Sequence, residues 1–126
     1  MDKKTILSIE NISKTYRNED IQVPALIDVS LAIEEGEFVM ITGHNGSGKS
    51  TLLHQLGLLD MPDKGKIILN DRDVVSMDEG NRTKLRLKYL GYIFQEYALI
   101  AELTALENVM LPAMLIGNSC DARKKA

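Results

Sequence analysis

The sequence has little of what marks disulfide-rich, membrane-spanning and nucleic-acid-binding proteins. Its only cysteine is Cys120, which excludes an internal disulfide framework and is compatible with a reducing compartment. No stretch approaches the roughly 20 consecutive apolar residues that a membrane-spanning helix needs, and residues 1–10 are too polar for a signal peptide. The net charge of -3 provides no general basic surface for nucleic acid. We therefore expect a soluble domain that binds no nucleic acid and reaches a membrane only through partner proteins.

One stretch of nine residues, 43–51, organises the rest of the chain. It reads Gly-His-Asn-Gly-Ser-Gly-Lys-Ser-Thr and matches the phosphate-binding pattern G-x-x-x-x-G-K-[ST]. The apolar run 38–41 precedes this loop and residues 52–56 follow it, which gives the order strand, loop and helix. In such a unit the backbone N–H groups of the loop and of the helix start converge on one phosphate group. The pattern predicts a site for the phosphates of a nucleotide.

The residue types in this loop have distinct expected roles. Glycines allow backbone conformations that side chains forbid. We expect the ammonium of Lys49 to reach the β- and γ-phosphates and the hydroxyl of Ser50 to bind Mg²⁺. The dinucleotide-binding pattern G-x-G-x-x-G is not met, because Thr51 stands where the third glycine would be. The candidate phosphate-binding residues are Gly43, Asn45, Gly46, Ser47, Gly48, Lys49, Ser50 and Thr51.

The pattern of apolar and polar residues around the loop predicts an α/β domain. Early strands joined by short turns should form an antiparallel sheet. A later apolar run should be a buried strand that carries Gln95 at its carboxyl end, where ligands bind in α/β sheets. The expected strands are residues 6–12, 25–33, 38–42, 66–69 and 90–94.

Two further helices are expected after the loop helix, each opened by a capping box. In this motif a serine or threonine and a glutamate three residues later satisfy each other's backbone N–H groups. Ser76 with Glu79 predicts one helix to about residue 88, and Thr104 with Glu107 predicts the other. Pro112 is expected to bend or shorten the second helix, because it removes a backbone hydrogen bond.

Short motifs on both sides of the phosphate loop carry a family resemblance. Upstream stand Ile-Ser-Lys-Thr-Tyr at 12–16 and Val-Pro-Ala-Leu at 23–26. Downstream stand Tyr-Ile-Phe-Gln at 92–95 and Leu-Thr-Ala-Leu-Glu-Asn-Val at 103–109. With the loop between them, these residues resemble the ATP-binding subunits of ABC transporters, closely those of the lipoprotein-release and macrolide-export branch.

The resemblance implies roles for residues outside the loop and for partners. Tyr16 would stack on the adenine ring of ATP, and Gln95 would join Ser50 as a Mg²⁺ ligand and approach the γ-phosphate. Transmembrane permease subunits would dock near residues 95–109. A second ATP-binding subunit would complete a dimer on the inner face of the cell membrane, where hydrolysis of Mg-ATP would drive export or lipoprotein release.

The resemblance also implies a fold and its extent. It is the ABC type of the α/β P-loop NTPase fold, with mainly antiparallel β structure at 1–37, part of the P-loop core and its parallel sheet at 38–95, and the start of a helical subdomain at 96–126. The chain contains no apolar run ending in Asp-Glu and no Leu-Ser-Gly-Gly-Gln, so it resembles only the amino-terminal half of such a subunit. Because phosphoryl transfer depends on positioning and charge stabilisation, we expect ATP binding with almost no turnover.

Two alternatives remain open at this point. A small P-loop kinase would need an arginine-rich lid over the phosphates, and the only basic cluster, residues 82–88, precedes an expected buried strand. A truncated module that binds a nucleotide or a partner without catalysis is the other alternative. Phosphate transfer to a metabolite would indicate the kinase, whereas ATP binding without turnover would fit the half-subunit.

Overall fold

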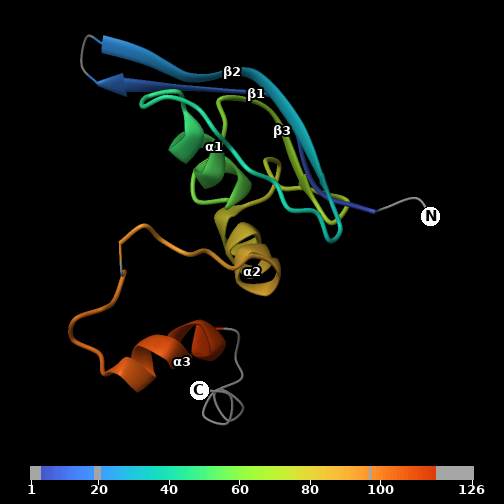
Figure 1. The fold of residues 1–126 in the computed structure, drawn as a ribbon. Coiled ribbons are helices and arrows are strands. Elements are labelled where there is room, and N and C mark those ends of the chain that lie inside the picture. Colours follow the sequence, from blue (N-terminus) through green and yellow to red (C-terminus); the bar gives the residue numbers. More distant parts are fainter. Residues whose placement is uncertain (1–3, 19–20, 97, 116–126) are drawn as a thin grey trace. The chain divides into compact units, whose positions relative to one another are not determined.

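The structure, a computed structural model, describes residues 4–18, 21–96 and 98–115 (Figure 1). The chain divides into two compact units, one ending at Asp78 and the other beginning at Glu79. The first unit holds the described strands and α1, and the second holds α2 and α3. The subdivision expected from the sequence, with boundaries at residues 37 and 95, stays a prediction. Cys120 lies outside the described residues.

The first unit is built on an antiparallel sheet with the strand order β2-β1-β3-β4. β1 (Thr5–Asn18) pairs with β2 (Ile21–Glu34) on one side and with β3 (Lys64–Leu69) on the other, and β4 (Arg72–Asp73) pairs with β3. The antiparallel sheet and the strands predicted at 6–12, 25–33 and 66–69 are confirmed, each within a longer strand. Pro24 lies inside β2, which tolerates it because an edge strand can leave backbone N–H positions unpaired.

β1 and β2 bend together where Asn11 and Asp28 lie. Both residues have left-handed backbone angles, φ 49° and φ 51°, which Asn and Asp tolerate better than most residues. The Asn11 side-chain amide donates to Asp28 Oδ1 at 2.7 Å and fixes the bend. The pairing of β1 with β3 ends at Ser13, so among the described strands residues 14–18 pair only with β2. Tyr16 therefore lies on a two-stranded arm, residues 14–18 and 21–26 (Figure 1).

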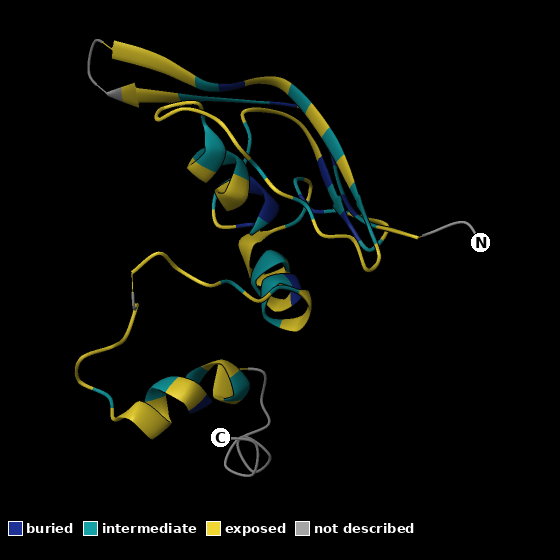
Figure 2. Ribbon diagram, viewed as in Figure 1, coloured by how far each residue is buried: buried dark blue, intermediate teal, exposed yellow. Residues whose placement is uncertain are grey.

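The core of the first unit combines side chains from the sheet, from α1 (Lys49–Leu56) and from the loops that follow α1 and β4. Ile12, Ile67 and Val74 are fully buried. Figure 2 shows the buried positions along the strands and at the end of α1, while the chain before α1 is mostly exposed. The buried apolar residues of this unit are Leu7, Ile9, Ile12, Leu26, Leu56, Leu58, Ile67, Leu69 and Val74.

Gln55 is a polar side chain inside this apolar core. It is 0% exposed, and neither Oε1 nor Nε2 has a hydrogen-bond partner among the described residues. A buried polar group without a partner costs about 1–3 kcal/mol. Replacing Gln55 by methionine, which has a similar length, should therefore raise the free energy of unfolding of this chain by about 1 kcal/mol. Urea denaturation followed by circular dichroism measures the change.

Gln55→Ala is the matched control for this prediction. It also removes the amide but leaves a cavity, which costs free energy of unfolding, so it should be less stable than Gln55→Met. A methionine variant less stable than the unaltered chain would show that the amide of Gln55 has a partner in solution.

The predictions of strands at residues 38–42 and 90–94 are wrong for the described structure. Residues 38–42 and 90–94 are not paired as strands, and Phe38 and Ile93 are 87% and 98% exposed. An extended segment becomes a strand only when a neighbour satisfies its backbone N–H and C=O groups. Among the described strands, none pairs with either segment, and all the described strand pairs are antiparallel. The run 90–94 is consequently not the buried strand that was expected to carry Gln95.

The second unit contains α2 (Glu79–Tyr89) and α3 (Ala105–Leu115). The capping box of α3 is confirmed: Glu107 Oε2 accepts from the Thr104 amide at 2.8 Å, and the Glu107 amide donates to Thr104 Oγ1 at 3.3 Å. The backbone hydrogen bond from Thr104 lowers the pKa of Glu107. Pro112 lies inside α3, which continues for three residues beyond it.

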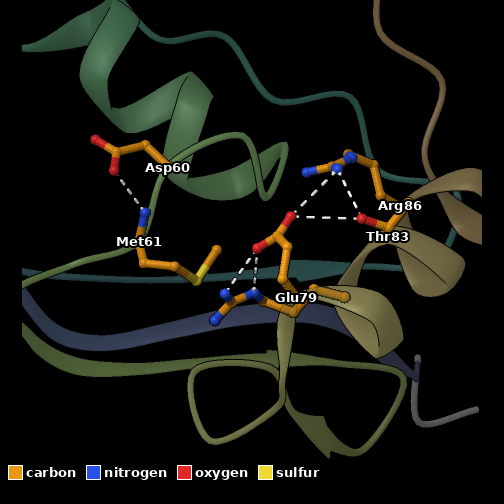
Figure 3. Close-up of polar contacts among 6 residues, drawn as sticks. Asp60, Met61, Glu79, Thr83 and Arg86 are labelled. Carbon is orange, nitrogen blue, oxygen red and sulfur yellow. Dashed lines mark hydrogen bonds and ion pairs between the residues drawn. The ribbon is translucent and has the colours of Figure 1, made fainter.

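The capping box predicted for α2 is wrong. The Ser76 hydroxyl donates to the carbonyl of Asp73 at 3.1 Å in the turn before the helix. Glu79 is the first helical residue, and its carboxylate binds Arg82 at 2.7 Å and lies 3.6 Å from Arg86 (Figure 3). The hydrogen bond from Arg82 lowers the pKa of Glu79. Within the described residues, none of the three helices has the length and apolarity required to cross a bilayer.

Candidate functional site

The predicted phosphate loop lies against β2 and leads directly into α1. Gly48 occupies the N-cap position with φ 87° and ψ 6°. A Cβ atom added to Gly48 would lie 2.4 Å from the carbonyl oxygen of Ala25 and 3.3 Å from Cδ2 of Leu26. Glycine is therefore required here both for the left-handed conformation and for the close approach to β2. The end of the loop is fixed against the edge strand of the sheet.

The loop and the first turn of α1 present unpaired backbone donors. The Ser47 amide donates to the His44 carbonyl at 3.3 Å, which closes a tight turn. The start of an α-helix leaves its first N–H groups without intrahelical partners and carries a partial positive charge. No side chain caps α1. From Gly46 through the first turn of α1, the backbone amides for which the described residues provide no hydrogen-bond acceptor are those of Gly46, Gly48, Lys49, Ser50 and Thr51, and this donor set fits a phosphate group.

Lys49 adds a positive charge to these donors. Its Nζ donates to the carbonyl of Gly43 at 3.0 Å and to that of His44 at 2.7 Å, so the ammonium lies against the beginning of the loop. Ser50 is exposed one residue further along. The described residues contain no cluster of three acidic, histidine or cysteine side chains that could hold a metal ion. Mg²⁺ at this site would depend on phosphate oxygens, water and a hydroxyl such as that of Ser50, which is how Mg²⁺ is held at many nucleotide sites.

Tyr16 lies in the same unit, on the two-stranded arm. Tyr16 is 43% exposed, and its hydroxyl donates to Asp60 Oδ2 at 3.1 Å. The ring lines an open pocket of about 790 Å³. Leu26 lines this pocket as well and is also one of the two β2 residues that approach Gly48. The structure thus brings Tyr16 and the phosphate loop to the same stretch of β2. The other residues of the pocket are Ser13, Lys14, Thr15, Arg17, Gln22, Ile27, Asp63 and Lys64.

Asp60 is a residue that the sequence did not single out. Burial raises the pKa of its carboxyl, but hydrogen bonds from Lys14 at 2.8 Å, from the Met61 amide at 2.8 Å and from the Tyr16 hydroxyl outweigh burial, and the pKa is lowered. Figure 3 shows the bond between Asp60 and the Met61 amide. Lys14 Nζ also donates to the Met61 carbonyl at 2.7 Å. In the sequence Asp60 belongs to a run of turn-forming residues, and only its contacts in the structure distinguish it.

The lowered pKa of Asp60 predicts a pH dependence of stability. A carboxyl whose pKa is lowered by folding stabilises the folded state above its ordinary value of 3.8, and this contribution is lost as the pH falls through that value towards the lower pKa of the folded state. The free energy of unfolding should therefore fall between pH 6 and pH 3, and it should fall less in Asp60→Asn. Urea denaturation of both chains at the two pH values measures the difference. An equal fall in both chains would contradict the assignment.

Gln95 belongs to the second unit and follows the unpaired segment 90–94. It is exposed and lines an open pocket of about 470 Å³ with Tyr92, Ile93, Phe94, Glu96 and Ala98. Its approach to Mg²⁺ and to the γ-phosphate stays a prediction.

The segment predicted to meet a membrane partner, residues 95–109, is ordered by Asn108. The side-chain Nδ2 donates to the carbonyls of Ile100 and Leu103 at 3.1 Å and of Thr104 at 3.0 Å, and Oδ1 accepts from the Ile100 amide at 2.8 Å. A largely apolar pocket of about 610 Å³ lies between residues 98 and 112. No motif in the sequence indicated this role of Asn108.

Comparisons with known proteins place these features in a family. The family described as ABC transporter matches residues 26–126. The chain is 48% identical to the lipoprotein-releasing system ATP-binding protein LolD of Aquifex aeolicus, a match that covers 89% of this chain and 48% of that protein. It is 43% identical to the macrolide export ATP-binding/permease protein MacB of Chlorobaculum tepidum, over 96% of this chain and 19% of that protein.

Solved structures of one bacterial ABC transporter cassette, MJ0796, share the fold. A dimeric structure matches with a TM-score of 0.84 and 41% identity, over 88% of this chain and 48% of the other. A post-hydrolysis structure bound to ADP and Pi matches with a TM-score of 0.85 and 37% identity, over 94% and 55%. The fold is thus the α/β P-loop NTPase fold of ABC cassettes, as the motifs predicted, although the chain spans only about half the length of the ATP-binding proteins it matches. The chain belongs to the ABC transporter family, and it corresponds to about half of an ATP-binding domain of that family.

Proposed function

We propose that the chain binds Mg-ATP as the phosphate-binding half of an ABC transporter ATP-binding subunit. The observation that carries the proposal is the loop of residues 43–51, which presents five unpaired amides between residues 46 and 51 and the ammonium of Lys49 at the start of α1. A phosphate chain needs such a converging set of donors and positive charge. The exposed face of Tyr16 takes the adenine ring, and Ser50 and Gln95 take Mg²⁺.

The chain's contribution to ATP hydrolysis is binding and orientation. Mg²⁺ supplies charge neutralisation on the phosphates when it is bound. The loop amides and Lys49 fix the phosphates, and Tyr16 fixes the base. Members of this family hydrolyse ATP, but the chain contains no apolar run ending in Asp-Glu and no Leu-Ser-Gly-Gly-Gln, so by itself it turns ATP over hardly at all. Nothing in the fold or in the comparisons favours a small P-loop kinase.

The proposed partners are a second ATP-binding subunit and transmembrane permease subunits that dock near residues 95–109. Supporting the first is the dimer in which the similar cassette MJ0796 was solved. Supporting the second are the apolar pocket between residues 98 and 112, the bracing of that segment by Asn108, and the names of LolD and MacB as transporter components. Through these partners the subunit would lie at the inner face of the cell membrane and drive export or lipoprotein release.

A titration of the 126-residue chain with Mg-ATP tests the proposal. Isothermal calorimetry should detect binding to one site, and a phosphate-release assay should detect no hydrolysis above background. Circular dichroism of the same sample verifies that the chain is folded. Absence of ATP binding by the folded chain, or transfer of phosphate to a metabolite, would overturn the proposed function.

A further inference from the structure

Lys14, Tyr16 and Asp60 form one connected polar cluster, and nothing proposed so far uses Lys14 or Asp60. The carboxylate of Asp60 accepts from both neighbours, with Oδ1 bound to the Lys14 ammonium at 2.8 Å and Oδ2 bound to the Tyr16 hydroxyl at 3.1 Å. Oδ1 also accepts from the Met61 amide. Both oxygens of Asp60 are thus used, and the orientation of its carboxylate is fixed.

The cluster joins two segments that are far apart in the sequence. Lys14 and Tyr16 belong to the two-stranded arm, whereas Asp60 follows α1, the helix that begins at the phosphate loop. Residues 14–18 have no pairing with β3, so the bonds to Asp60 connect this end of the arm to the segment that carries the phosphate loop. The position of the Tyr16 ring is therefore set relative to α1.

The same contacts determine which part of the Tyr16 ring is available. Lys14 Nζ lies 5.5 Å from the ring centroid and covers one face in a cation–π contact. The hydroxyl is held at the ring edge by Asp60. Tyr16 nevertheless remains 43% exposed and borders the pocket of about 790 Å³. One face is left for a flat ligand.

We propose that Asp60 and Lys14 are positioning residues for the purine base of a bound nucleotide, because they hold the Tyr16 ring in the orientation that receives the base. The inference rests on the proposed function and goes beyond it by assigning two residues outside the phosphate loop to base binding. Fixing a side chain before binding lowers the entropy that is lost on binding. The benefit exists only for ligands that carry a base, so it is absent for inorganic triphosphate.

The test compares the dissociation constants of ATP and inorganic triphosphate, both with Mg²⁺, for the full 126-residue chain and its variants. Tyr16→Ala should weaken ATP binding about tenfold through lost stacking and leave triphosphate binding unchanged. Asp60→Asn and Lys14→Met should each weaken ATP binding about threefold, less than Tyr16→Ala because the ring is still present, and should also spare triphosphate. Asp60→Asn added to Tyr16→Ala should cause no further loss.

Tyr16→Phe provides a second route to the same answer. It removes the hydrogen bond from the Tyr16 hydroxyl but leaves the Lys14–Asp60 ion pair. It should weaken ATP binding about as much as Asp60→Asn does, and it therefore tests the positioning role even if Asp60→Asn lowers the free energy of unfolding. Asp71→Asn is the matched control, because it changes an exposed carboxylate of the same unit that pairs with Lys4 at 3.7 Å, and both ligands should bind it normally.

The outcomes separate this inference from the proposed function. The positioning role would be overturned if Asp60→Asn and Tyr16→Phe weakened the binding of ATP and of triphosphate equally, or weakened neither. It would also be overturned if Asp60→Asn still weakened ATP binding threefold in the Tyr16→Ala background. Failure of the unaltered chain to bind either ligand would instead overturn the proposed function.

Discussion

Lys49→Ala should weaken the binding of ATP to this chain by about 100-fold, or roughly 3 kcal/mol. The ammonium of Lys49 is the charged donor of the loop, and its bonds to Gly43 and His44 place it at the beginning of the turn that the phosphates would occupy. Alanine removes both the charge and these two bonds, so the phosphates lose a charge-assisted contact and the loop loses an internal brace. Calorimetric titration with Mg-ATP measures the loss.

Lys66→Ala is the matched control for this substitution. Lys66 is an exposed lysine of β3 in the same unit, so its removal changes the net charge equally and should leave ATP binding nearly unchanged. Circular dichroism of both variants would verify that they remain folded. Equal affinities of the Lys49 and Lys66 variants for ATP would contradict the placement of the phosphates on this loop.

Gly48→Ala should lower the free energy of unfolding by about 3 kcal/mol and also abolish nucleotide binding. A left-handed backbone costs a residue with a Cβ atom about 1–2 kcal/mol. The new Cβ would in addition meet the Ala25 carbonyl at 2.4 Å, and relieving overpacking of this kind costs a further 1–3 kcal/mol or so. Because the obstacle is backbone of β2, the loop must move away from the strand. Denaturant unfolding measures the first effect and ATP titration the second.

Gly46→Ala separates the two costs. Gly46 has a similar φ of 79°, but a Cβ atom there would meet nothing within 4 Å. This variant should therefore lose only about 1–2 kcal/mol of unfolding free energy. Similar losses in the Gly46 and Gly48 variants would show that the loop does not press against β2 in solution.

The parts of the fold that were predictable from the sequence are those decided by nearby residues. The capping box of Thr104 and Glu107 depends on two side chains three residues apart, and the predicted helix is present. The prediction for Ser76 was wrong because its hydroxyl can also bond inside a turn, and the Asp73 carbonyl is the acceptor it uses. A helix start is thus less certain where several polar residues precede it.

Segments whose structure depends on a distant partner were not predictable in the same way. The apolar runs 38–42 and 90–94 have a composition typical of strands in parallel sheets. Composition does not supply a neighbouring strand, and none of the described strands pairs with either run. The sequence therefore indicated the apolar character of these segments correctly and their pairing incorrectly.

In the candidate site, too, the features made by consecutive residues were predictable and those made by distant residues were not. The loop at residues 43–51 was found from its pattern, because consecutive residues create it. The contact between Tyr16 and Asp60 spans 44 positions, and Asp60 looked like any other residue of a turn. Only the fold brings such a pair together, so the phosphate contacts were predictable from the sequence and the support of the base contact was not.

The bend at Asn11 and Asp28 divides β1 into parts of unequal resistance to fraying. Before the bend, the amide protons of β1 lie between two neighbouring strands. Residues 14–18 pair with β2 alone and are otherwise held by hydrogen bonds to Asp60 and Asp63 in the segment after α1. Warming should therefore release the tip that carries Tyr16 before it loosens the strand beside β3. The chain would then lose its contact with the base of a bound purine nucleotide while the triphosphate was still held, and the difference in affinity between ATP and inorganic triphosphate would decline at temperatures below that of global melting.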